Sequence, residues 1–204
     1  LLTLTFGLFL FDVDLDGDLD LFAGNGHVQE EIAQTQDGIT YAQPPHLFLN
    51  QGDGRFEDAA PAHGGVLAAP IVARGAAYGD IDRDGDLDVL VVENGGGAHL
   101  WRNDLPDQAR SVRVALHGTV SNRSALGSHL LAVADGQRME RRVRAGGSFL
   151  SQSELTATFG LGGANRIDTL VVTWPSGTRA TFTDLQAGET YLLREDDAPV
   201  PAPL

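Results

Sequence analysis

The chain has 204 residues and a net charge of −14, and its 14 cationic residues are all arginine because lysine is absent. Without lysine there is no P-loop or Schiff-base site, and without cysteine there is no thiol nucleophile, disulfide or thiolate metal site. Residues 1–104 hold 18 acidic residues and four arginines, whereas residues 105–204 hold ten of each. The acidic half argues against nucleic acid or an anionic membrane as a partner.

The first segment, residues 1–11, is apolar and continues directly into a run of aspartates. It has no basic flank and no small-residue cleavage site, so we expect a strand rather than a signal peptide. No apolar stretch in the chain reaches 18 residues, which excludes a transmembrane helix and membrane insertion through one.

Two nine-residue runs, residues 12–20 and 80–88, both read D-x-D-x-D-G-D-L-D and start 68 residues apart. Neighbouring carboxylates in such a run repel one another by about 1 kcal/mol or more per pair. Calcium offsets this repulsion because it accepts about 6–8 oxygen ligands in flexible geometry, and the glycine lets the chain turn around the ion. The sequence therefore predicts about two calcium ions, with these candidate ligands: Asp12, Asp14, Asp16, Asp18, Asp20, Asp80, Asp82, Asp84, Asp86 and Asp88.

Two other interpretations of these loops fit the sequence less well. An EF-hand requires glutamate at position 12 of the loop, where this chain has Ala23 and Val91, and it requires flanking helices instead of the β-type runs seen here. A single solvated acidic turn would be the ordinary explanation of one such run. Two copies with the same aspartate and glycine positions favour metal binding.

The rest of the acidic half also predicts strands. Residues 46–50 and 55–57 flank a glycine-rich turn and indicate a β-hairpin. Further strands are expected at residues 75–78, 87–92 and 98–102, and connecting loops at residues 29–45 and 61–70.

The charge balance changes at the polar turn of residues 103–108, where we place the boundary between domain 1–104 and domain 110–194. Seven short strands separated by turn residues predict a small β-sandwich in the second domain. The segment 195–204 is rich in proline and is expected to be a disordered tail. The expected strands are Val112–Leu116, Leu130–Ala134, Met139–Val143, Leu155–Phe159, Ile167–Trp174, Ala180–Phe182 and Tyr191–Leu193.

The first half, over residues 9–104, resembles the FG-GAP/VCBS repeat family, in which D-x-D-x-D-G-x-x-D loops between propeller strands bind calcium. The second half resembles the ASPIC/UnbV domain through SNRSALGS (121–128), VRAGGSFLSQS (143–153), FGLG (159–162) and WPSGT (174–178). The combination is similar to the cartilage acidic protein-like family. The resemblance implies an all-β chain: a partial β-propeller of about two blades, truncated at its N-terminus, followed by the sandwich.

The same resemblance implies a secreted or extracytoplasmic calcium-binding protein of the recognition or adhesion type, without catalysis, whose partner is an extracellular protein or glycan. Loops around residues 121–123 and 148–152 are candidate contacts. The alternatives are a glycan-acting hydrolase or its accessory domain, and an assembly or linker module. The six histidines are scattered and form no H-E-x-x-H motif, which argues against an enzyme.

Overall fold

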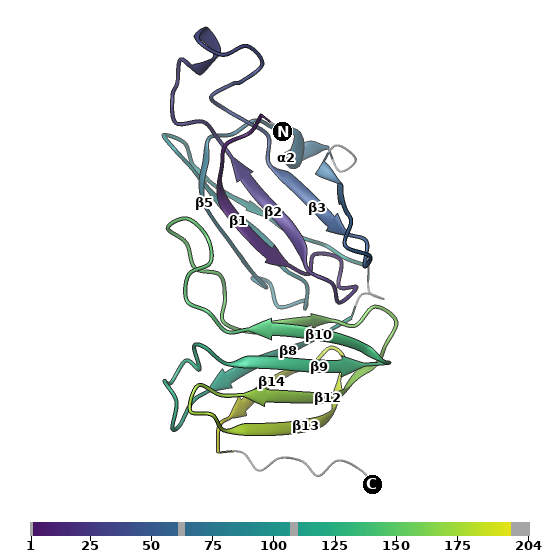
Figure 1. Ribbon diagram of the computed structural model, residues 1–204. Coiled ribbons are helices and arrows are strands. Elements are labelled where there is room, and N and C mark those ends of the chain that lie inside the picture. The colour runs from purple at the N-terminus through teal and green to yellow at the C-terminus, as the bar shows by residue number, and fades with distance from the viewer. Residues whose placement is uncertain (1, 61–63, 107–109, 197–204) are drawn as a thin grey trace.

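The computed structural model describes residues 2–60, 64–106 and 110–196, and these residues form an all-β chain in two parts (Figure 1). No helix in these ranges is long and apolar enough to span a membrane. The helical elements with described bounds are short: a 3-10 turn at Ile32–Gln34 and the helix α2 at Gly65–Ala68. The four sheets of the chain therefore carry its architecture.

Two antiparallel sheets form the N-terminal part and pack against each other through β1, β2 and β5. Each sheet is a meander. The first strand of each sheet leads into one acid-rich loop, and the chain returns from that loop as the second strand. Alternating apolar residues of β1 and β2, including Phe9, Phe11 and Phe22, fill the space between the sheets. The strands are β1 (Thr5–Phe11), β2 (Asp20–Asn25), β3 (His46–Asn50), β4 (Phe56–Asp58), β5 (Ala73–Gly79), β6 (Asp88–Glu93) and β7 (Ala98–Trp101).

The C-terminal part is a sandwich of a four-stranded and a three-stranded sheet. One sheet has the order β10-β9-β12-β13, and the other has the order β11-β8-β14 with β14 parallel to β8. Their strands are β8 (Ser111–His117), β9 (His129–Ala134), β10 (Gln137–Arg142), β11 (Ala157–Gly160), β12 (Arg166–Thr173), β13 (Arg179–Gln186) and β14 (Thr190–Arg194).

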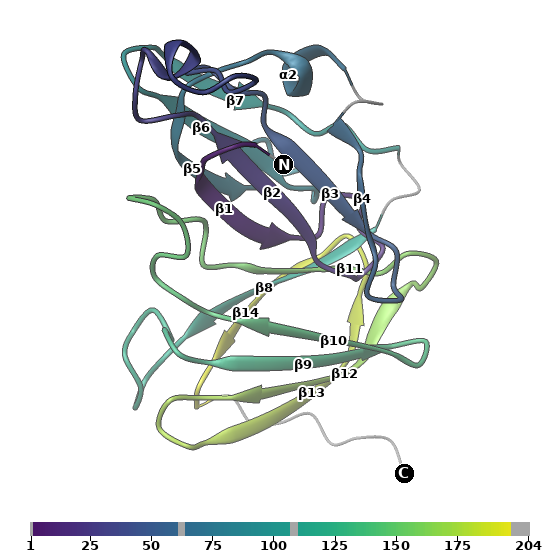
Figure 2. The ribbon, with the colours of Figure 1, turned by 45° about the horizontal axis from the view of Figure 1, so that its top comes forward.

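Each part buries its own hydrophobic core, and no residue belongs to both cores. The sandwich core contains Trp174, Phe159, Leu170 and Val172, all with exposures of 2 % or less. The predicted fold class, a partial propeller followed by a sandwich, is confirmed. Figure 2 shows that the acid-rich ends of the first two strands point toward the sandwich, so the loops lie where the two parts meet.

Glu195, the first residue of the expected tail, is buried immediately after β14. Its carboxylate accepts hydrogen bonds from the backbone N–H groups of Thr119, Val120 and Ser121, and from the hydroxyls of Ser121 and Ser176. Glu195 therefore joins two of the strings that carry the ASPIC/UnbV resemblance. Residues 197–204 of the expected tail lie outside the described residues.

We predict that Glu195→Gln lowers the melting temperature at pH 7. Desolvation raises the pKa of Glu195, but hydrogen bonds from the hydroxyls of Ser176 and Ser121 and from backbone N–H groups lower it by a larger amount, so that the pKa falls to about 2. Because the pKa of Glu195 in the folded chain lies below the ordinary value of 4.5, the stabilisation of the fold by the ionised Glu195 carboxylate is present above pH 4.5 and is lost as the pH falls toward 2. Melting curves of wild type and variant should converge over that interval, and the exposed Glu189→Gln variant should match the wild type throughout.

Candidate metal centres

The two acid-rich loops have the same backbone conformation. Their fourth residues, Leu15 and Arg83, have φ of 60° and 67°, and their sixth residues, Gly17 and Gly85, have φ of 99° and 100°. The left-handed conformation is the reason that glycine recurs at the sixth position. The repeat seen in the sequence is therefore also a repeat in structure.

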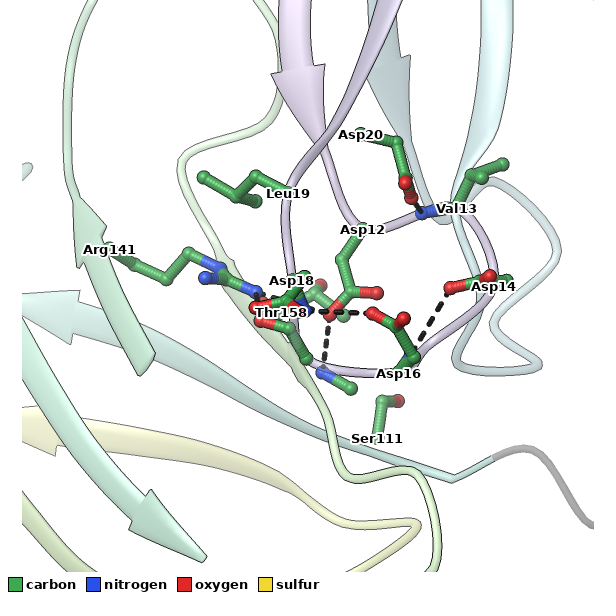
Figure 3. A network of polar contacts seen from close by, with 12 residues as sticks. Asp12, Val13, Asp14, Asp16, Asp18, Leu19, Asp20, Ser111, Arg141 and Thr158 are labelled. Carbon is green, nitrogen blue, oxygen red and sulfur yellow. Dashed lines mark hydrogen bonds and ion pairs between the residues drawn. The ribbon is translucent and has the colours of Figure 1, made fainter. Parts of the chain in front are cut away.

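In the first loop, Asp12, Asp14 and Asp20 each present one carboxylate oxygen within 4.8 Å of the others (Figure 3). Asp20 is fixed in place because it accepts backbone hydrogen bonds from Val13, at 2.9 Å, and from Asn50, at 2.8 Å. Asp12 and Asp20 are buried, whereas Asp14 is exposed. The three aspartates could together hold a metal ion.

Asp12 carries the clearest sign that the first loop is built around a ligand. Its side chain is buried, and Oδ2 accepts hydrogen bonds from the Gly160 backbone at 3.0 Å and from Arg141 at 3.1 Å. Oδ1 is buried and has no hydrogen-bond partner among the described residues. A buried oxygen without a partner is costly, and a cation beside Asp14 and Asp20 would satisfy it.

The second loop repeats this arrangement with Asp80, Asp82 and Asp88. Asp88 accepts backbone hydrogen bonds from Ile81, at 2.9 Å, and from Asn103, at 3.0 Å, as Asp20 does in the first loop. The loops therefore hold their ninth residues in the same way, and each of them could hold a metal ion. Their first residues differ, because both oxygens of Asp80 accept backbone N–H groups of the loop, from Arg83 and Gly85, whereas Oδ1 of Asp12 has no partner among the described residues.

The other four predicted ligands lie outside these two groups. Asp16 Oδ1 accepts the backbone N–H of Asp18, and Asp84 Oδ1 accepts that of Asp86, so these carboxylates shape the turns. Asp86 also accepts the Leu105 N–H through Oδ2, while its buried Oδ1 has no partner among the described residues. None of these four belongs to either group of three carboxylates, and their role as ligands stays a prediction.

Burial raises the pKa of several loop carboxyls. Desolvation raises the pKa of Asp12 to about 7, against the opposing effects of Arg141 and the Gly160 N–H. Desolvation also raises the pKa of Asp20 to about 6 and that of Asp86 to about 6, although backbone hydrogen bonds lower both. These carboxylates resist ionisation in the absence of a counter-charge, and a divalent cation supplies one.

Two asparagines support the loops and were not identified as functional residues from the sequence. Asn50 ends β3 and Asn103 lies two residues beyond the end of β7. Their backbone N–H groups donate to Asp20 and Asp88. A second repeat, H-L-x-x-N at residues 46–50 and 99–103, is visible in the sequence and could have found them. The signal is that in both repeats this motif follows the acid-rich loop and the strand after it, although the spacing differs.

Two arginines of the sandwich also reach the loops, one to each first aspartate. Arg141 on β10 pairs with Asp12 at 3.1 Å, and Arg113 on β8 pairs with Asp80 at 2.9 Å. Both arginine side chains are 11 % exposed, and both aspartate side chains are 1 % exposed. Arg113 also pairs with Glu154, at 2.6 Å. No local pattern in the sequence connects these arginines with loops more than 30 residues away.

Comparison with protein families gives matches for both parts of the chain. Residues 12–91 match the FG-GAP-like repeat, and residues 118–200 match ASPIC and UnbV. A comparison with curated proteins found no match. The first match covers both acid-rich loops, and the second covers most of the sandwich together with Glu195. The N-terminal part of the chain therefore carries an FG-GAP-like repeat, and the C-terminal part carries an ASPIC and UnbV domain.

Proposed function

We propose that this protein is a calcium-binding, non-catalytic recognition module of the extracellular type, with one structural calcium ion in each acid-rich loop. The observation that carries the proposal is the buried, unpartnered Oδ1 of Asp12 beside the carboxylates of Asp14 and Asp20. The backbone hydrogen bonds to Asp20 and Asp88 fix the position of one carboxylate in each group of three aspartates without needing an ion. The ions would then fix the ends of the blade strands.

Calcium suits these groups better than a transition metal. Both groups consist of aspartates only, so every side-chain donor is a hard oxygen, and neither includes histidine among the described residues. Carboxylate, carbonyl and water oxygens favour calcium or magnesium, and calcium tolerates the irregular geometry of a nine-residue loop. Calcium sites of modest affinity fill at extracellular concentrations, about 10⁻⁴–10⁻³ M, which supports a location outside the cytosol.

The distribution of buried acids supports a role without catalysis. A glycosidase-type hydrolase needs two carboxyl groups facing each other across a substrate. Among the described residues, Glu195 is the one buried acid outside the acid-rich loops, and its oxygens accept hydrogen bonds from N–H and hydroxyl groups. It therefore serves to hold strands and loops together.

Recognition of a partner would use exposed loops of the sandwich. Ser148 and Ser121, from the two loops named as candidate contacts, make internal bonds to Leu8 and Glu195. Next to Ser148, the side chains of Phe149 and Leu150 are 42 % and 90 % exposed. Exposed apolar side chains on an ordered loop suit contact with an extracellular protein or glycan.

The test is calorimetric titration of chelator-stripped protein with calcium, combined with melting curves of wild type and Asp14→Asn. We expect two binding events in the wild type and one in the variant. Free calcium at about 100 times the dissociation constant adds about 2.7 kcal/mol per site, and Asp14→Asn should lose most of the contribution of the first site. In chelator the variant should be as stable as wild type or slightly more stable, because it relieves repulsion between carboxylates.

Asp37→Asn is the matched control, since Asp37 is an exposed aspartate outside the loops. It should bind two ions like the wild type. An equal loss of stability for Asp14→Asn in calcium and in chelator would show that Asp14 acts without a metal, and no heat of binding in the wild type would refute the proposal.

A further inference from the structure

We propose that calcium in the first loop also stabilises the docking of the sandwich on the propeller part, so that removal of the ion makes the two docked domains separate more often. This inference rests on the proposed function, because it assigns a regulatory consequence to the same ion. It follows from the position of Asp12, which belongs to both the candidate metal site and the domain interface.

The two oxygens of Asp12 face different partners. Oδ2 accepts the backbone N–H of Gly160 and a guanidinium N–H of Arg141, both of which belong to the sandwich. Oδ1 has no partner among the described residues, and Asp12 belongs to the group with Asp14 and Asp20. An ion bound by Oδ1 would fix the carboxylate in the orientation in which Oδ2 meets the sandwich.

The backbone of the first loop makes further bonds across the interface. The Leu15 carbonyl accepts the Gly162 N–H at 2.8 Å, and the Asp16 carbonyl accepts the side-chain amide of Gln137 at 3.1 Å. The Gly17 carbonyl accepts a bond from Arg141 at 3.2 Å. These carbonyls point toward the sandwich only when the loop has its folded shape, which a bound ion stabilises.

Apolar packing also crosses the interface, because the Phe6 ring on β1 meets the Phe149 ring of the C-terminal part with their centroids 5.0 Å apart. The two hydrophobic cores are separate, and a cleft of about 480 Å³ lies between β1 and the segment 140–158 of the sandwich. The second loop adds a pair between Asp80 and Arg113, and the Ser111 hydroxyl donates to the Gly85 carbonyl at 2.6 Å. The acid-rich loops therefore supply part of the interface, and bonds from Leu8 on β1 to Ser148 and from Tyr78 on β5 to Ser153 supply another part.

Coupling of this kind is reciprocal. If calcium favours docking, docking must raise calcium affinity by the same factor, commonly about 5–150-fold. The coupling can therefore be tested from both directions, by removing calcium and watching the interface, and by disturbing the interface and measuring calcium affinity.

The first test measures amide hydrogen exchange of the whole chain in calcium and in chelator. The amides of Gly160 and Gly162 donate across the interface to Asp12 and Leu15, so their exchange reports undocking. We expect chelation to accelerate their exchange at least tenfold (about the lower end of the coupling range) while Leu170, in the sandwich core, stays protected. Equal protection of Gly160 in both conditions, with calcium binding measured on the same sample, would overturn the inference and leave the proposed function standing.

The second test places a methyl group in the interface without changing any charge. A Cβ at Gly160 would lie 2.5 Å from Asp12 Oδ2 and would collide with the backbone of Leu15. Gly160 is outside the left-handed region, so alanine fits its backbone, and Gly163→Ala is the matched control because a Cβ there meets nothing within 4 Å. In an Asp82→Asn background, which leaves the first loop as the calcium site, Gly160→Ala should weaken calcium binding about tenfold and Gly163→Ala should not.

The outcomes separate the two proposals. Unchanged calcium affinity in Gly160→Ala contradicts the coupling alone. Absence of calcium binding in the unmodified chain contradicts the proposed function and the coupling together. If Gly160→Ala does not fold, the exchange measurement on the wild type decides the question.

Discussion

Arg141→Ala is expected to lower the free energy of unfolding by about 3–5 kcal/mol in chelator at pH 8. The reason is that the variant leaves the Asp12 carboxylate, which is 1 % exposed, without its cationic partner. Arg141 also donates to the carbonyls of Thr158 and Gly17 and lies over the Phe159 ring, so the loss includes hydrogen bonds and packing. Urea unfolding followed by circular dichroism measures the difference.

Arg142→Ala is the control for this experiment, because Arg142 is the next residue of β10 and is exposed. Its substitution removes the same charge as Arg141→Ala. Its effect should stay below about 0.5 kcal/mol, as is usual for a surface substitution. The Arg141→Ala loss should be smaller at pH 5, where Asp12, whose pKa burial raises to about 7, holds a proton and needs no counter-charge. Similar losses for the two variants would contradict a special role of Arg141.

The second large effect is an opposite pH dependence of stability with and without calcium. In the ion-free protein, burial raises the pKa of Asp12 from 3.8 to about 7, so between these values the folded chain holds a proton that the unfolded chain has released. Stability must therefore fall as the pH rises through this interval, by at most about 4 kcal/mol for this carboxyl. Asp20 and Asp86, whose pKa values burial raises to about 6, act in the same direction.

With calcium the slope should reverse, because the ion binds the ionised carboxylates and its affinity rises with pH. Melting temperatures of chelator-stripped and calcium-loaded protein at pH 5 and pH 8 test this. The measured range from pH 5 to pH 8 lies above the interval in which Glu195 titrates, because the stabilisation by Glu195 is complete above pH 4.5. An ion-free protein that becomes more stable from pH 5 to pH 8 would show that ionising Asp12 costs the fold little.

Much of the fold could be predicted because the signals are local. Each of the seven strands expected in the second half overlaps an observed strand, from β8 to β14, since alternating apolar residues and turn residues define a strand within a few positions. The spacing of aspartate and glycine in the two loops likewise determines their backbone, as the shared left-handed residues show.

The tertiary structure decided which carboxylates act together and what else they contact. The sequence presents five equivalent aspartates in each loop, whereas the fold buries Asp12 and Asp20 and leaves Asp14 exposed. It also brings Arg141 to Asp12 across 129 positions of the chain.

Contacts between residues so far apart in the sequence follow from how two sheets dock, and no periodicity in the sequence encodes them. By itself the sequence determined the strands, the acidic loops and the charge that needs compensation. Only the tertiary structure supplied the compensating partners, because burial and pairing are properties of packed surfaces and not of neighbouring residues.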